Sequence, residues 1–375
     1  MTHSVPELGE KTSHLWLDGL RRNQLEDGTL DKLVARSGIG GVSTAIGSRD
    51  RAIDDSEFYR AVISVCARYG ETAEQIYERL NVEDAQAVAD VLRPTYDATG
   101  CRDGYVSLAV SPFLAYTTAD TIEDADRLWA AVDRPNLMIS VPATDAGVAA
   151  IPALIARGIN VRVTLLFSRS RYEQIADAYC DGLETRLARG ATLANVTSVA
   201  SVHVHAIDAW ADRALERVAA CMGLPMRGKA GLAVAARCYG AYRSRQRATR
   251  WDGLRVAGAQ PQRLCWVTSG TEEPASREGL DLLALTSTDT LTSVTPATLD
   301  RLLDDRVSVP NAPEEIDAVS DAFEALRAID IHLEQQASAL EREGLAQLVD
   351  AYTRCVERIE TRRRAIVGAQ QGVGT

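Results

Sequence analysis

The sequence predicts an α/β fold of the (β/α)8 barrel class with a C-terminal helical extension. Short β-branched or apolar runs recur along the chain, and each is followed by a longer stretch with helical spacing. This alternation is typical of consecutive βα units around a parallel sheet. Eight such runs can be counted, and eight parallel strands in βα order close into a barrel. A chain of 375 residues can form one barrel of this kind.

The predicted strands are separated by enough residues for a helix to return the chain to the sheet. They are His14–Leu20, Gly38–Ala45, Gly104–Pro112, Asn136–Thr144, Asn160–Phe167, Ser198–Ile207, Leu264–Ser269 and Leu291–Val294. The helices predicted between them are Asp55–Tyr69, Thr72–Leu80, Thr121–Ala131, Ala146–Arg157, Ser170–Arg189 and Gly228–Arg245. Terminal signals support these helices; Gly158, for example, follows Arg157 as a natural C-terminal stop.

Strand character ends at about residue 297, and 313–364 carries apolar residues at helical spacing among charges. We therefore expect a barrel over 1–300, a helical extension over 301–366 and a disordered tail over 367–375. No repeat or low-complexity linker divides the chain. The extension could cap the barrel, cover its mouth or join a partner chain, and a homodimer is left open.

The charge balance argues against two classes of partner. A net charge of −11 would repel nucleic acid and anionic membranes. The apolar runs are too short to span a membrane, and the polar start lacks the apolar region of a signal peptide, so we expect a cytoplasmic protein. Seven cysteines without CxxC spacing support neither a disulfide framework nor a zinc ribbon, and no cofactor is implied.

Several segments resemble those of bacterial long-form transaldolases and occur in the same order. They are LWLDGL with LEDGTLDKLV, RPNLMISVPAT, GINVRVTLLFSRSRY, SVASV, GKAGLA, RWDGL and TSGT, between about His14 and Asp300. Such long colinear agreement is more specific than any single motif. The resemblance implies a barrel with its site at the C-terminal ends of the strands.

The resemblance also implies a Schiff-base lysine on the fourth strand, in a segment similar to NLMIKVPAT. This chain has NLMISVPAT, with Ser140 at that position. A serine hydroxyl cannot form an imine. The chain's three lysines, Lys11, Lys32 and Lys229, lie outside the predicted strands. We therefore expect no ordinary transaldolase turnover.

Other positions depart from the family pattern. The resemblance implies an asparagine at Ala45, an acid at Ala109, an arginine at Ala206 and a basic residue at Glu272. In the family, the basic residues at the positions of Ala206 and Glu272 face the substrate phosphate. Their loss would disfavour phosphorylated sugars as substrates. The resulting pocket suits an uncharged or apolar ligand.

A few positions match the family or bring new polar groups. Asp18, Thr164 and Ser201 correspond to pocket residues of transaldolases. Arg162 stands where the family has asparagine, and it shares the inward parity of Thr164. Because a buried guanidinium needs a carboxylate partner, we expect Arg162 to pair with Asp18.

Two histidines follow Ser201 at alternate positions, so a continuous sixth strand would direct Ser201, His203 and His205 into the barrel. The histidines could form an acid–base pair, or two metal ligands that would still need a third from Asp18 or Glu272. They could equally fill a hydrogen-bonding niche.

These substitutions lead to three functional hypotheses. The first is a repurposed lyase, isomerase or cyclase of specialised metabolism, with His203, His205 and Asp18 as catalytic residues. Its small-molecule substrate would bind in the barrel mouth, in contact with Ser140, Thr164, Ser201, Arg162, Ala45, Ala109 and Glu272. The second is a catalytically inactive homologue that acts as a binding or scaffold protein. The third is residual transaldolase activity through a displaced lysine.

Overall fold

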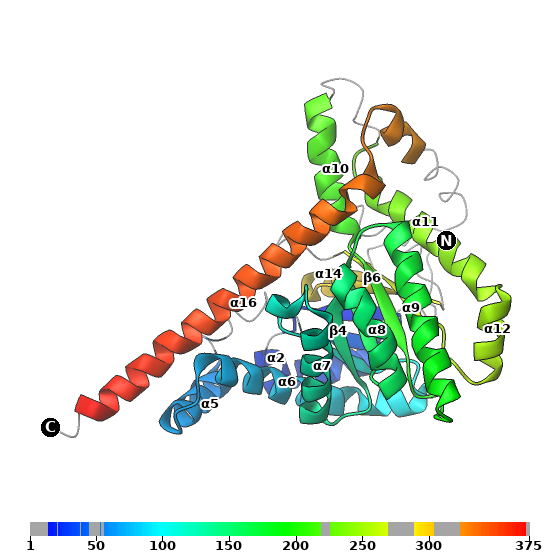
Figure 1. Cartoon of the computed structure of the whole chain (residues 1–375). Coiled ribbons are helices and arrows are strands. Elements are labelled where there is room, and N and C mark those ends of the chain that lie inside the picture. The colour runs from blue at the N-terminus through cyan, green and yellow to red at the C-terminus, as the bar shows by residue number, and fades with distance from the viewer. Residues whose placement is uncertain are drawn as a thin grey trace.

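Eight parallel strands close into a barrel in the computed structural model of the chain (Figure 1). The structure describes residues 14–20, 22–37, 39–44, 53, 56–218, 226–268, 289–303 and 323–372. Each strand pairs with the next, and β1 pairs with β8 to close the ring. The strands are β1 Leu15–Asp18, β2 Gly41–Ser43, β3 Tyr105–Ala109, β4 Leu137–Pro142, β5 Val161–Leu166, β6 Ser198–Val202, β7 Arg263–Val267 and β8 Thr290–Val294. The predicted fold class is confirmed.

The sixth predicted strand was wrong at its C-terminal end. β6 stops at Val202, and helix α10 (Val204–Val218) begins two residues later. The alternating residues after Ser201 imitate a strand, but Ile207 N donates to His203 O in the first turn of a helix. Local periodicity could not reveal that the chain leaves the sheet here.

Helices surround the barrel, and those between consecutive strands return the chain for the next parallel strand. They are α2 Arg22–Glu26, α3 Thr29–Ser37, α5 Glu57–Arg68, α6 Ala73–Ala98, α7 Thr118–Val132, α8 Asp145–Arg157, α9 Arg169–Ala188, α10, α11 Ala230–Gln246, α12 Thr249–Val256, α14 Pro296–Leu303 and α16 Leu333–Gly372, with a 3-10 turn, η2, at Pro112–Leu114. Helix α6 starts with a capping box of Thr72 and Gln75. It runs well beyond the predicted end at Leu80, because Val88 and Leu92 continue its buried face.

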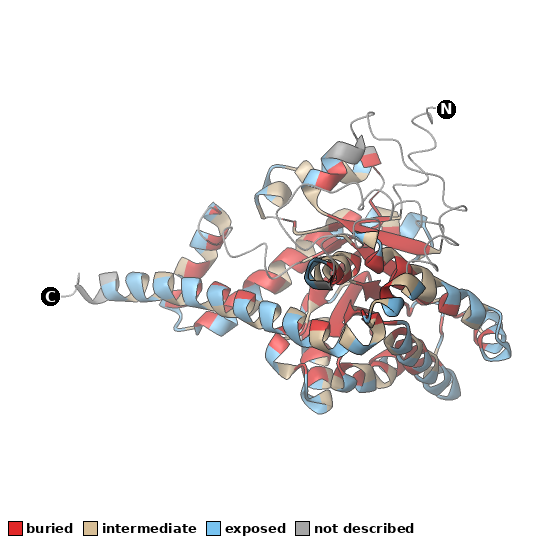
Figure 2. Ribbon diagram, turned by 90° about the horizontal axis from the view of Figure 1, so that it is seen from above, coloured by how far each residue is buried: buried red, intermediate tan, exposed pale blue. Residues whose placement is uncertain are grey.

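The barrel is filled by side chains at its N-terminal half. Buried residues from six strands form one apolar layer: Trp16, Tyr105, Met138, Val199, Cys265 and Leu291. The strands form the buried centre of the molecule in Figure 2. The strands are buried on both faces, because helices cover the outside of the barrel and packed side chains fill its inside.

Gly41 makes room for the largest side chain of this layer. A Cβ at Gly41 would lie 2.4 Å from Cε2 of Trp16. We expect Gly41→Ala to lower the free energy of unfolding by about 1–3 kcal/mol, because the indole would have to move within a packed core. Urea unfolding measures this loss. Gly240→Ala is the control, since a Cβ there meets no atom within 4 Å and helix α11 should tolerate it. Equal stability of the two variants would contradict the prediction.

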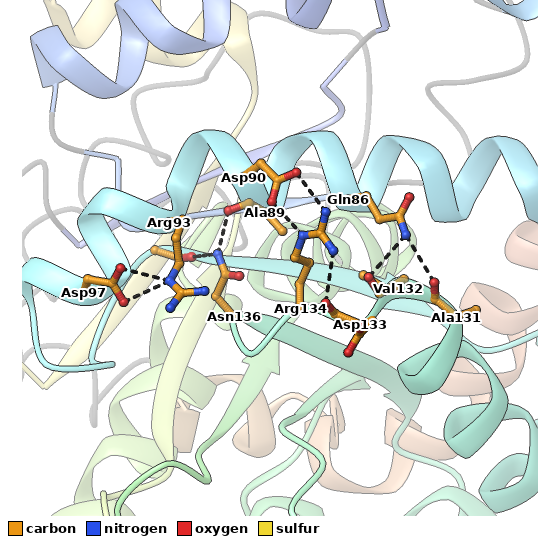
Figure 3. Close-up of polar contacts among 11 residues, drawn as sticks. Gln86, Ala89, Asp90, Arg93, Asp97, Ala131, Val132, Asp133, Arg134 and Asn136 are labelled. Carbon is orange, nitrogen blue, oxygen red and sulfur yellow. Dashed lines mark hydrogen bonds and ion pairs between the residues drawn. The ribbon is translucent and has the colours of Figure 1, made fainter.

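Polar contacts with α6 fix the entry into β4 (Figure 3). Asn136 donates from Nδ2 to the carbonyl oxygens of Ala89 and Gly104, each at 2.8 Å. Arg134 forms a bidentate pair with Asp90, with distances of 2.6 and 3.0 Å. These contacts hold the start of the strand that carries Ser140.

Helix α16 packs beside the C-terminal ends of the strands. It contacts β5, η2, α10, α5 and α6, and its end projects from the body (Figure 1). The Tyr352 ring makes edge-to-face contacts with the rings of Tyr77 and Phe113, with centroids 4.6 and 5.5 Å apart. The helix continues to Gly372, beyond the predicted boundary at 366. In the described part of the chain, no helix combines the length and apolar character needed to cross a membrane.

Candidate functional site

A polar layer lies above the apolar layer, toward the C-terminal ends of the strands. It consists of Asp18 on β1, Ser43 on β2, Ser107 on β3, Ser140 on β4, Arg162 and Thr164 on β5, and Ser201 on β6. Strand residues two apart share a face, so the sequence reaches this layer two residues after Trp16, Tyr105, Met138 and Val199. The same parity could have identified Ser43 and Ser107, which the sequence analysis missed.

The carboxylate of Asp18 is held at one side of the mouth. The Ser43 hydroxyl donates to its Oδ1 at 2.5 Å. The neighbouring Thr44 hydroxyl donates to the carbonyl oxygen of Ser107 at 2.8 Å, which ties the end of β2 to β3. Asp18 remains partly exposed, so its carboxylate is accessible from the mouth.

His203 lies at the opposite side, directly after β6. Its Nε2 and the Thr164 hydroxyl share a hydrogen bond of 2.9 Å, and its backbone N–H donates to Leu166 O at 3.0 Å. Desolvation by the surrounding protein lowers the pKa of His203 from 6.5 to about 4; the Arg162 charge lowers it further, and Asp18 opposes the shift. The imidazole is therefore neutral at pH 7, where it can accept a proton.

The backbone of β5 is irregular at Leu165, which lies between Thr164 and Leu166. Leu165 has a φ of +56°, and the pairing of β5 with β6 shifts register between Val163 and Leu166. A left-handed conformation costs a leucine roughly 1–2 kcal/mol. Gly344 of α16 packs on this side chain, since a Cβ there would lie 2.7 Å from Leu165 Cδ2. The docked helix thus covers the strained residue beside the site.

Ser140 and Arg162 lie opposite each other on β4 and β5. Ser140 is 8% exposed and Arg162 5%. The guanidinium reaches across the lumen, donating from Nε to the Ser201 hydroxyl at 3.0 Å and from Nη1 to the Ser107 hydroxyl at 3.1 Å. The predicted pairing of Arg162 with Asp18 is therefore wrong, because hydroxyls on β6 and β3 accept its hydrogen bonds.

The described lysines lie away from this layer. Lys32 is exposed on α3, and Lys229 is exposed immediately before α11. Lys11 lies outside the described residues. In the described part of the barrel interior, Ser140 and its neighbours therefore offer hydroxyl groups and a guanidinium, but no amine.

The structure does not place the two histidines on one strand face. His205 lies on α10 because β6 ends before it, so the predicted pair of inward histidines is wrong. The described residues contain no group of three histidine, cysteine or carboxylate side chains suited to a metal ion.

Of the remaining predicted site residues, Ala206 and Ala109 lie in described parts of the chain, and Ala45 and Glu272 do not. Ala206 also lies on α10, partly exposed, and Ala109 ends β3. Beside Ala109 and Thr44, a cavity of about 50 Å³ is lined by Tyr352 of α16. Ala45 and Glu272 lie outside the described residues.

The similarity to known proteins covers the whole barrel and most of α16. The family model described as transaldolase/fructose-6-phosphate aldolase matches residues 15–359. The chain belongs to this family. It is similar to the transaldolase of Thiobacillus denitrificans, with 35% identity covering 94% of this chain and 97% of the relative. Transaldolases of Thermobifida fusca and Mycobacterium tuberculosis show 34% and 35% identity; the coverage is 96% and 99% of this chain, and 98% and 100% of the relatives.

These comparisons overturn the leading functional hypothesis. Relatives that match almost the full length are named transaldolase, and none of these names is that of a lyase, an isomerase, a cyclase or a scaffold protein. The repurposed lyase, isomerase or cyclase and the inactive scaffold are therefore wrong as interpretations of this chain. They depended on changes at single positions, whereas family similarity extends through all eight βα units. The comparisons give names and identities of relatives, and they do not test whether a Schiff-base lysine has been lost at the position of Ser140.

Proposed function

We propose that this protein has a transaldolase function, transferring a ketol fragment from a hydroxyketone to an aldehyde at the C-terminal mouth of the barrel. Family membership over residues 15–359 supports the reaction class. The observation that carries the proposal is the neutral His203, bonded to Thr164 at the rim of the polar layer. An unprotonated imidazole at such a position can accept the proton of a substrate hydroxyl, and its lowered pKa makes it a weaker base than a free histidine.

The reaction needs proton transfer coupled to carbon–carbon bond cleavage. His203 accepts the proton of the substrate hydroxyl beside the bond that breaks. The bonding electron pair moves toward the ketone oxygen, and the aldehyde leaves. An acceptor aldehyde then receives the same fragment, and the proton returns to the new hydroxyl. Thr164 orients the imidazole, and Asp18 holds a hydroxyl of the bound ketose.

Ser140 gives this proposal a specific chemical form. An imine requires an amine, and the hydroxyl of Ser140 cannot supply one. We propose that the ketone reacts as a free carbonyl beside Ser140 and Arg162.

A coupled assay with fructose 6-phosphate and erythrose 4-phosphate tests the function, with unphosphorylated fructose as a second donor. We expect transfer to the acceptor by the unmodified protein with at least one donor. Absence of transfer with both donors would overturn the proposed function.

Borohydride trapping tests the chemical form in the same reaction mixtures. We expect no trapped adduct on the unmodified protein, because the described interior holds no amine. Ser140→Lys is the positive control, since it places an amine on β4. A trapped peptide containing Lys11, Lys32 or Lys229 would refute reaction through the free carbonyl. Ligand binding in the mouth and pairing into a homodimer remain predictions.

A further inference from the structure

Two buried arginines in the described barrel interior have unlike surroundings. Arg263, 4% exposed at the start of β7, donates to Asp103 Oδ1 at 2.8 Å and to Arg102 O at 2.5 Å. Asp103 is also buried, so a carboxylate neutralises this guanidinium inside the protein. Arg162 is equally buried, but its hydrogen bonds go to two neutral hydroxyls.

Within the part of the chain that the structure describes, Arg162 hydrogen-bonds to hydroxyl groups and forms no ion pair with a carboxylate. The guanidinium carbon lies 5.2 Å from the centroid of the Trp16 ring, which attracts a cation weakly but carries no net charge. Serine hydroxyls satisfy N–H groups without cancelling the charge, and a buried uncompensated cation is costly. Arg162 uses Nε and Nη1 for its hydrogen bonds to described residues, which leaves Nη2 for a ligand.

The guanidinium also lies where a bound carbonyl compound would meet it. Arg162 is paired in register with Ser140, and Thr164 follows it on the same inward face of β5. Its charge reaches both sides of the layer, because it lowers the pKa of His203 at the mouth and acts on the buried thiol of Cys265. An anionic oxygen between Ser140 and His203 would therefore be in its field.

We propose that Arg162 forms an oxyanion-binding site at the floor of the mouth, which takes a planar anionic oxygen group such as an enediolate or a small carboxylate. Its catalytic meaning rests on the proposed function. When the carbon–carbon bond breaks, the electron pair reaches the ketone oxygen, the aldehyde departs, and His203 takes the hydroxyl proton. The enediolate oxygen then carries the negative charge that the guanidinium binds. Preorganised cationic donors at such a position stabilise the developing charge.

Binding of glycolate tests the site without any turnover. Glycolate carries a carboxylate where the enediolate would carry its oxygens, and glycolamide is its uncharged counterpart. In calorimetric titrations at low salt, we expect glycolate to bind the unmodified protein at least tenfold more tightly than glycolamide. Arg162→Met should abolish that preference, whereas Lys229→Met, which removes an exposed cation, should keep it. Equal binding of both ligands, or unchanged preference in Arg162→Met, would overturn the proposal.

A second measurement covers the case in which Arg162→Met does not fold. The pKa of the His203 imidazole is followed by NMR in the unmodified protein with and without glycolate. An anion on Arg162 should raise this pKa, because it neutralises a charge that lowers it. Asp18 is the other charge that acts on the pKa of His203. It is present in both samples, so it does not account for a difference between them. An unchanged or lowered pKa at saturating glycolate would overturn the site. Glycolate binding without ketol transfer would retain the site and refute the proposed function.

Discussion

Replacing His203 by alanine is expected to lower kcat for ketol transfer by roughly 10²- to 10⁴-fold, the range that a positioned general base contributes. The expectation follows from the neutral imidazole, its 2.9 Å hydrogen bond to Thr164 and its place at the mouth. Steady-state rates in the coupled assay measure the effect. His14→Ala is the matched control, because burial lowers the pKa of that histidine too, but it precedes β1 at the opposite end of the barrel.

The pH profile gives the same prediction a second test. A general base is active when neutral, so activity is lost as the pH falls through its pKa in the folded protein. Since that pKa is lowered to about 4, kcat/KM should remain level through pH 6.5 and fall only near pH 4. An acid limb near pH 6.5, or a His203→Ala variant as active as His14→Ala, would contradict the assignment.

Arg263→Met is expected to lower the free energy of unfolding by about 3–5 kcal/mol, because it leaves the buried carboxylate of Asp103 without its counterion. Arg162→Met should leave the ligand-free protein as stable as before, or more stable. That variant replaces a buried cation by an apolar side chain and strands no carboxylate. Urea unfolding at pH 7 without added ligands compares the two.

A double variant separates charge from packing in this comparison. Arg263→Met combined with Asp103→Asn removes both charges, so it should recover part of the loss seen with Arg263→Met alone. A loss in Arg162→Met as large as that in Arg263→Met would show that Arg162 is compensated in the ligand-free protein. The physical basis of the oxyanion-binding site would then be wrong.

The number and order of the strands and, up to Val202 on β6, the inward parity of their residues follow from the sequence. Repeated apolar runs separated by helical stretches are local patterns, and the closed barrel follows from their number and order. The same parity placed Arg162 and Thr164 toward the lumen. Colinear segments identified the family, which full-length relatives support.

Contacts between distant parts of the chain set the end of β6 and the partners of the buried charges. The alternation through His205 fits a strand, but the end of a strand depends on ladder contacts with β5 and β7, not on periodicity. Likewise, Arg263 finds Asp103 far away in the sequence, while Arg162 finds Ser107 and Ser201 from two other strands. A pattern of nearby residues fixes the face on which a side chain lies. Its charge partner and its pKa depend on burial and on groups that only folding brings together.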